Sequence, residues 1–450
     1  MIEQYFPRFG WGGLDECRIH RGPTHRSVEP CRYFIAIPIY DEPDVTGVLK
    51  SLTDCSAPSA RFRIIATVNH PAGVNDNVRI RSQVAIDSLL EFQHSKILPD
   101  WLDLVVVEAL DLPPRKAGVG LARKIGMDLC LREIETAFSE CVLVALDADC
   151  RVSPEYLKSL EEHFEFHPEW SSCSIYYEHP LDRCEDEHTR DAISQYETHL
   201  RLYTDLVRLT GLPYGYHTVG SSMAVRADTY IRLGGMNTRK AGEDFYFLEK
   251  FMKTGNHSRL QTTAVYPSHR ISHRVPFGTG RAMSEMLDPK ENGPTESTNR
   301  ERKMWMTYPL EIFDYLKDFT EDWDQAYHQD LDQYFQETRI AKPLAEYLHQ
   351  SGDHKAIRTI RGRSTSLKVF RKNMSHHFDA FWIMKWANDS VQRWTERIPV
   401  NDCLIEFRKR LGSMESNDNS NDTRNREMDL SWLRTHDRNL PVQDPTHHSG

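Results

Sequence analysis

Short apolar runs alternate with stretches of helical spacing through roughly the first half of the chain. The runs at 33–40, 62–68, 104–107 and 141–146 have the length of β-strands. Between them, apolar residues recur at helical spacing over 45–52, 80–92 and 119–131. The alternation predicts an α/β, Rossmann-like fold with a mixed, mostly parallel sheet sandwiched by helices. In such folds ligands bind at the carboxyl ends of the strands.

The same pattern predicts how single residues and later segments are placed. In the helix over 80–92 we expect Val84, Leu89 and Leu90 to point inward. Further on, the sequence predicts a helix over 154–166, a strand over 172–177 and a long helix over 184–210. A new helix is expected to begin at Glu243 and Asp244.

Changes in the pattern predict five segments. Residues 1–31 form a leader that packs loosely, 32–285 a catalytic domain, and 286–302 a polar connection. Residues 303–413 form an α-helical C-terminal extension, and 414–450 a disordered tail poor in apolar residues. Aromatic residues from Phe378 to Trp394 are expected to pack in a core; the alternative is an acceptor-binding or membrane-surface helix.

Composition narrows the class of protein. The 450 residues carry a net charge of −10, which disfavours a broad nucleic-acid-binding surface. The nine cysteines show no CxxC pair and no zinc-like spacing, so free thiols in a reducing cytoplasm are expected. No apolar run is long enough to cross a bilayer, and peripheral membrane contact stays open.

Acidic residues follow two of the predicted strands. Asp41 and Glu42 come after the run at 33–40, and Asp147-Ala148-Asp149 ends the run at 141–146. On an extended backbone the i, i+2 spacing points both aspartates to one side. Two carboxylates about 5 Å apart repel by about 3 kcal/mol at an effective dielectric near 20. If the two strands are adjacent and parallel, these acids meet at one edge and suit a divalent cation; a turn-capping role is the alternative.

A third acidic pair follows Gly242 at the start of a predicted helix. Helix capping alone could explain Glu243 and Asp244. The helix dipole would lower the pKa of either carboxyl, which weakens a general base unless burial or neighbouring acids oppose it. Basic residues alternate with the acids along the chain and could meet phosphates: Arg115, Lys116, Arg123, Lys124, Arg270, Arg274 and Arg281. For Lys124 a solvated helix face is the expected alternative.

Taken in order, these motifs resemble the family 2 glycosyltransferases of the GT-A fold. The chain has Pro-x-Tyr-x-Glu after the first strand, then Gly-x-Gly-x-Ala-Arg, Asp-x-Asp, Gly-Ser-Ser, Gly-Gly-Met and Gly-Glu-Asp. The resemblance covers about residues 32–282. It implies a hexosyltransferase-like enzyme that uses a nucleotide-diphospho-sugar donor with Mn²⁺ or Mg²⁺. The acceptor is a hydroxyl of a glycan, a lipid-linked molecule or a small molecule, and no nucleic acid is involved.

The resemblance also implies roles for individual residues. Asp149, with Asp147, would hold the metal and diphosphate, and Asp244, beside Glu243, would be the general base of an inverting reaction. His273 or His269 would be a further metal ligand, as in some GT-A enzymes; a surface position is the alternative. Residues expected at the nucleotide sugar are Pro38, Tyr40, Glu42, Asn69, Lys116, Arg123, Asp147, Ser221 and Arg274.

The chain departs from the family pattern in two places. Val68-Asn69-His70 stands where the second strand often ends in an acidic pair, which leaves the base open. The Gln-x-x-Arg-Trp signature of processive synthases is absent. The alternatives are a retaining transferase acting on a small acid, a sugar-nucleotide pyrophosphorylase, and a non-catalytic carbohydrate-binding scaffold. A pyrophosphorylase would need a glycine-rich loop where Asp41-Glu42-Pro43 stands.

Overall fold

The structure is a computed structural model that describes residues 1–22, 29–240, 242–271, 278–287, 304–336, 340–412 and 423–443. The described chain divides into two units. Unit 1 comprises 1–183 and 218–282, and unit 2 comprises 184–217 and 283–450. The predicted catalytic domain, 32–285, therefore contains a helical segment that belongs to the other unit.

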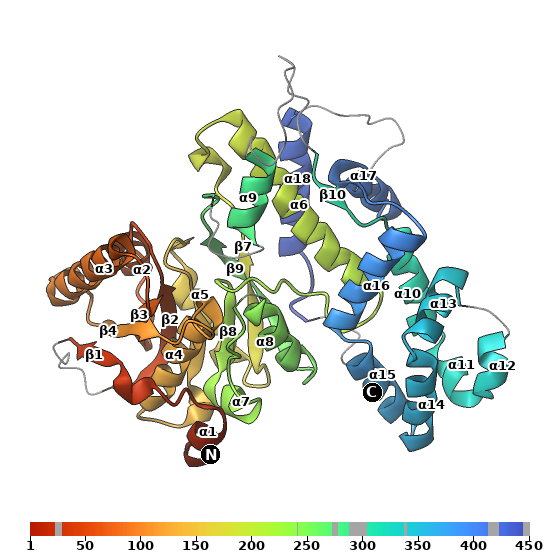
Figure 1. Ribbon diagram of the computed structural model, residues 1–450, viewed down its shortest axis with the longest axis horizontal. Helices are drawn as coiled ribbons and strands as arrows, with labels where there is room; N and C mark the ends of the chain where they lie inside the picture. Colours follow the sequence, from red (N-terminus) through yellow and green to blue (C-terminus); the bar gives the residue numbers. More distant parts are fainter. Residues whose placement is uncertain are drawn as a thin grey trace. The chain divides into compact units, whose positions relative to one another are not determined.

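Unit 1 is built on one sheet (Figure 1). Its described strands run in the order β1-β4-β3-β2-β5-β8-β7-β9-β6. The strands are β1 Arg18–Arg21, β2 Cys31–Ile39, β3 Arg61–Pro71, β4 Leu102–Leu112, β5 Val142–Ala145, β6 Arg151–Val152, β7 Ser172–Tyr177, β8 Met223–Arg226 and β9 His257–Tyr266. Strands β4, β3, β2 and β5 pair in parallel, as do β7 and β9. The pairings β1–β4, β5–β8, β8–β7 and β9–β6 are antiparallel. The longest ladders are parallel, so the predicted mixed α/β sheet is confirmed.

Strand β2 lies in the parallel half because its residues are apolar on both faces. Residues 33–37 of β2 are all buried, as expected for a strand covered by helices on both sides. Its partners on either side are β3 and β5. The strands that precede Glu42 and Asp147 are thus adjacent and parallel, which is the condition for these acids to meet at one edge.

Helices of unit 1 pack along this sheet (Figure 1). They are α1 Ile2–Phe9, α2 Thr46–Thr53, α3 Asp76–His94, α4 Val119–Arg132, α5 Tyr156–Phe166, α7 Ala227–Arg232 and α8 Glu243–Met252; α9 Thr279–Leu287 spans the boundary between the units. Helix α3 turns Ile86, Leu89 and Phe92 inward. The inward placement predicted for Val84 is wrong, since this side chain is 57% exposed. The helix begins four residues earlier than expected, and the buried stripe includes Ser82 and Ala85 instead.

The first nine residues do not pack loosely, contrary to expectation. Helix α1 buries Tyr5, whose hydroxyl donates to Asp128 of α4 at 2.6 Å. Asp128 also accepts hydrogen bonds from Tyr230 at 2.9 Å and from the Trp11 backbone at 2.8 Å. Lys124 pairs with the same carboxylate at 3.0 Å and is buried, so a solvated helix face is wrong for this residue. A charged residue on α4 therefore anchors α1.

We expect Tyr5→Phe to lower the free energy of unfolding by about 1–3 kcal/mol, because a buried carboxylate loses a hydrogen bond. For a unit of this size each kcal/mol corresponds to about 2–4 °C in Tm. Thermal denaturation followed by circular dichroism measures the change. Gln4→Ala, at an exposed position of the same helix, is the control and should leave Tm unchanged. Equal Tm values for Tyr5→Phe and wild type would show that the contact does not stabilise the protein.

Unit 2 is helical. Its elements are α6 Glu187–Leu209, α10 Glu311–Glu321, α11 Trp323–His328, α12 Leu331–Gln336, α13 Lys342–Gln350, α14 Asp353–Arg363, α15 Leu367–His377, α16 Ala380–Arg393, α17 Val400–Arg410 and α18 Thr423–Arg438, with a short ladder of β10 Met306–Thr307 and β11 Ile398–Pro399. Helix α18 lies within the segment predicted as a disordered tail. Its few apolar residues include Leu430 and Leu433, which are fully buried.

One buried and one partly buried ion pair join α18 to α6. Arg426 contacts Asp191 at 2.7 Å, and Arg434 contacts Glu197 at 2.8 Å. In α16 the expected core role is confirmed for Trp382, Ile383 and Trp386, which are buried. Across the described ranges, the chain has no helix with the length and apolar character that a membrane crossing requires.

Candidate functional site

The acidic residues after β2 and β5 lie at one edge of the sheet because these strands are parallel neighbours. The Asp147–Cys150 segment is a turn, closed by the Cys150 amide, which donates to the Asp147 carbonyl at 3.1 Å. The extended geometry expected for Asp147 and Asp149 is therefore not found. Each carboxylate instead contacts a different arginine.

Arg123 joins the first of these carboxylates to helix α8. Its guanidinium donates to Asp147 at 2.7 Å and, through its other terminal nitrogen, to Glu243. Arg123 and Glu243 are both buried, whereas the Asp147 side chain is 35% exposed. Arg123 was predicted near the base or phosphates of a nucleotide. The structure places it beneath Asp147, where it fixes the carboxylate and the start of α8 together.

Arg270 joins the second carboxylate to the end of β2. It contacts both oxygens of Glu42, at 2.9 and 2.5 Å, and lies 3.5 Å from Asp149. The bidentate contact holds Glu42 in a buried position, while Asp149 stays 29% exposed. From the sequence, Arg270 is expected only as one of the late basic residues that could meet phosphates. A bridge between two strand ends cannot be seen until the strand order is known.

Glycines in the sequence motifs let these parts approach one another. A Cβ on Gly120 would lie 2.2 Å from the Arg239 carbonyl oxygen and 3.0 Å from the Glu243 Cβ. A Cβ on Gly220 would lie 2.8 Å from the Arg123 guanidinium. Gly242 adopts φ 68° immediately before α8, a conformation that favours glycine. A side chain at Gly120 or Gly220 would therefore collide with the residues around Arg123 and Glu243.

Asp244 has the electrostatics of a base that works near neutral pH. Burial is the main cause that raises the pKa of its carboxyl to about 7, and the neighbouring charge of Glu243 adds to it. The charge of Arg123 and a hydrogen bond from the Phe245 amide at 2.8 Å act in the opposite direction. Asp244 is half-buried, and the desolvation of its carboxyl opposes the lowering of the pKa that the helix dipole would cause.

The net negative charge of the side chains at this edge would attract a cation. Five carboxylates, from Glu42, Asp147, Asp149, Glu243 and Asp244, surround the guanidinium groups of Arg123 and Arg270. Among these seven groups, all in the described part of the chain, the negative ones exceed the positive ones by three when every acid is ionised. In the described ranges no three His, Cys, Asp or Glu side chains form a complete ligand set. One or two carboxylates plus phosphate oxygens are, however, the usual ligands of Mg²⁺.

The other residues predicted for the site lie at strand ends, elsewhere on the protein, or outside the described residues. Pro38 and Tyr40 lie at the end of β2, and the buried Asn69 lies near the end of β3, where its carboxamide oxygen has no hydrogen-bond partner among the described residues. Ser221 is buried beside Cys150. Lys116 is exposed, and its Nζ stands 5.6 Å from the centre of the Trp11 ring. His273 and Arg274 lie outside the described residues, and His269 is half-buried.

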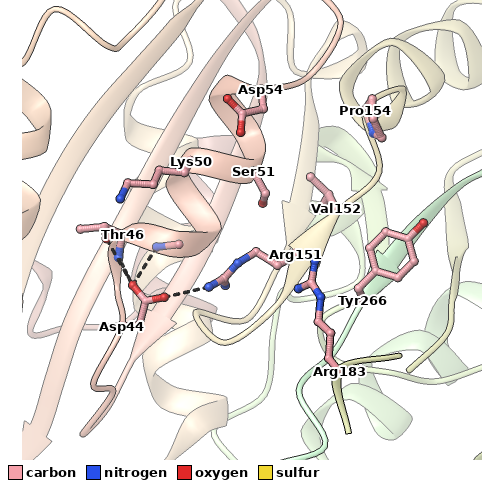
Figure 2. Close-up of a pocket in the computed structure, with 11 residues that line it drawn as sticks. Asp44, Thr46, Lys50, Ser51, Asp54, Arg151, Val152, Pro154, Arg183 and Tyr266 are labelled. Carbon is pink, nitrogen blue, oxygen red and sulfur yellow. Dashed lines mark hydrogen bonds and ion pairs between the residues drawn. The ribbon is translucent and has the colours of Figure 1, made fainter. Parts of the chain in front are cut away.

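A cavity of about 450 Å³ lies next to the edge, at the start of α2 (Figure 2). Asp44 closes one side, since it accepts from the Gly47 amide at 2.9 Å and pairs with Arg151 at 2.8 Å. Lys50 and Arg183 also line it, and neither makes an ion pair within the part of the chain that the structure describes. None of these residues was predicted, because the motifs point to the strand ends rather than to α2.

Comparisons with known proteins give limited similarity. No family model matches the sequence, and no curated protein matches it. Among solved structures, TarS 1–349 of S. aureus in complex with UDP shares 13% identity, covering 87% of this chain and 94% of that chain, with a TM-score of 0.35. The same protein in complex with UDP-GlcNAc shares 13% identity over 87% and 95% of the chains, with a TM-score of 0.37. Since both TM-scores are below 0.5, we infer neither the fold nor the activity of this chain from them.

Proposed function

We propose that the protein is a glycosyltransferase that moves a sugar from a nucleotide-diphospho-sugar to an acceptor hydroxyl. The observation that carries the proposal is the grouping of Asp147, Asp149 and the Glu243-Asp244 pair at one sheet edge, with an Asp244 pKa of about 7. A base with this pKa can accept a proton at neutral pH. The order of motifs that resembles the family 2 glycosyltransferases supports the same reaction.

In the proposed reaction Asp244 accepts the proton of the acceptor hydroxyl. The hydroxyl oxygen forms a bond to the anomeric carbon of the sugar, from the face opposite to the diphosphate. The bond between that carbon and the diphosphate oxygen breaks, and its electron pair leaves with the diphosphate. The sugar is therefore transferred with inversion.

The remaining residues prepare the edge for this chemistry. Arg123 holds Glu243 against Asp147, which fixes the position of Asp244 at the start of α8. Arg270 holds Glu42 and approaches Asp149, so the two strand ends keep a constant spacing. Asp149 and Asp147 would hold Mn²⁺ or Mg²⁺ together with the diphosphate. When bound, the ion supplies positive charge that stabilises the leaving diphosphate.

Asp149→Asn should abolish metal-dependent nucleotide binding. With the wild-type protein, a nucleoside diphosphate at 100 times its Kd and Mn²⁺ should stabilise the fold by about 2.7 kcal/mol. A thermal-shift screen of nucleoside diphosphates, with Mn²⁺ or with EDTA, measures the effect and identifies the base. The exposed Asp87→Asn on α3 is the control and should respond like wild type. Equal stabilisation of Asp149→Asn and wild type would contradict the assignment of the metal site.

A further inference from the structure

Helices α14 and α15 of unit 2 carry a concentration of positive charge that the proposed reaction does not use. Residues 354–378 contain seven lysines and arginines and no aspartate or glutamate, in a chain whose net charge is −10. The seven are Lys355, Arg358, Arg361, Arg363, Lys368, Arg371 and Lys372. All of these side chains are exposed except that of Arg361, which is half-buried. We call this set the basic surface.

Neighbouring acids neutralise only part of this charge. Arg358 pairs with Asp332 of α12, and Arg371 pairs with Asp324 of α11 at 2.5 Å. In the described residues Lys355, Arg363 and Lys372 make no ion pair with an acid. Intramolecular pairing therefore does not account for the positive charge of these three side chains.

Apolar residues of the two helices are directed into the protein. Ile357 of α14 and Phe370 and Met374 of α15 are fully buried, and the two helices pack on each other within unit 2 (Figure 1). The apolar faces are thus used for folding, and the basic faces are left to solvent. Val369 is the exception, since it is 37% exposed between Lys368 and Arg371.

We propose that the basic surface binds the surface of an anionic lipid membrane. Groups of four to eight lysines and arginines on amphipathic helices are attracted to anionic lipids. The charges are spread over two helices and their connection, which suits an extended anionic surface. The one phenylalanine of α14 and α15, Phe370, is buried, and the two helices contain no tyrosine or tryptophan, which disfavours stacking of single-stranded bases. Because the apolar faces are already buried, binding is electrostatic and without deep insertion.

The test measures sedimentation of the full chain with phosphatidylcholine vesicles, with and without phosphatidylserine. We expect binding to the anionic vesicles, little binding to the neutral ones, and release at high salt. Each lysine or arginine near an anionic membrane strengthens partitioning about fivefold. Replacing Lys355, Arg363 and Lys372 together with glutamine should therefore weaken binding about 100-fold.

A matched variant separates this surface from a general loss of positive charge. Replacing Arg18, Lys96 and Lys158 of unit 1 with glutamine removes the same charge from exposed positions and should leave vesicle binding within about twofold of wild type. Thermal melts establish that both variants fold. Equal effects of the two variants, or equal binding to neutral vesicles, would overturn the proposal. Binding of the wild type to duplex DNA or heparin without binding to anionic vesicles would overturn it as well.

Discussion

Replacing Asp244 with asparagine should lower the rate of sugar transfer by about 10²–10⁴-fold, the usual contribution of a general base. Asparagine keeps the size of the side chain and removes the oxygen that would take the proton. Nucleotide binding should persist, since Asp149 and Asp147 are unchanged. Transfer is measured as nucleoside diphosphate released and as glycosylated acceptor formed. The control is Glu249→Gln, which removes a carboxylate of the same helix that pairs with Lys253.

The same residue sets the expected pH dependence. Because the pKa of Asp244 is raised to about 7, the carboxyl carries a proton below that pH and cannot accept another. Activity of the wild type should thus rise with pH through about 7 and level off above it. At pH 8 the ionised form is disfavoured by its surroundings, so Asp244→Asn should melt at the same or a higher temperature. Full activity of Asp244→Asn would exclude it as the base.

Arg123→Met should destabilise the protein by about 3–5 kcal/mol, because Glu243 is left as a buried charge and Asp147 loses its partner. At about 2–4 °C per kcal/mol, Tm should fall by about 10 °C. The variant should also shift the pH profile of any residual transfer upward, because the charge of Arg123 lowers the pKa of Asp244. Circular dichroism melts and pH–rate measurements test the two effects separately.

Two further variants show whether the effect comes from the bridge. Arg115→Met removes an exposed arginine just before α4 and should leave Tm within about 1 °C of wild type. Adding Glu243→Gln to Arg123→Met removes the buried unpaired charge and should recover part of the lost stability. A Tm of Arg123→Met close to that of wild type would mean that the bridge does not stabilise unit 1.

The sequence predicts much of unit 1 because its strands are buried on both faces. The apolar runs at 33–40 and 172–177 correspond to β2 and β7 almost residue for residue, and the helix over 119–131 corresponds to α4. The hydrophobic pattern does not predict polar residues that are buried because they bind specific partners. Lys124 and Asp128 are charged residues on α4, and only the position of Tyr5 in space explains why both are buried.

The acidic residues of the candidate site were predicted from the sequence as candidates. The arginine bridges between these acids were not predicted. The positions of Glu42 and Asp147 after apolar runs indicate a shared sheet edge, and β2 and β5 are indeed neighbours. Which arginine meets which acid depends on contacts between residues 120 and 228 positions apart, such as Arg123 with Glu243 and Arg270 with Glu42. No local pattern encodes such pairs. For the same reason the membership of α6 in unit 2 was not predicted.

The division of the chain has a consequence for synthesis on the ribosome. Unit 1 is interrupted at residue 184 and resumes at 218, so β8 and β9 emerge only after α6. Helix α18 is synthesised more than 200 residues after α6. The ion pairs of Asp191 with Arg426 and of Glu197 with Arg434 can therefore form only then. Loop closure over this distance makes the contact slow to form. A nascent chain that stops before residue 423 would therefore lack Arg426 and Arg434, and the surface of α6 that α18 covers would stay exposed.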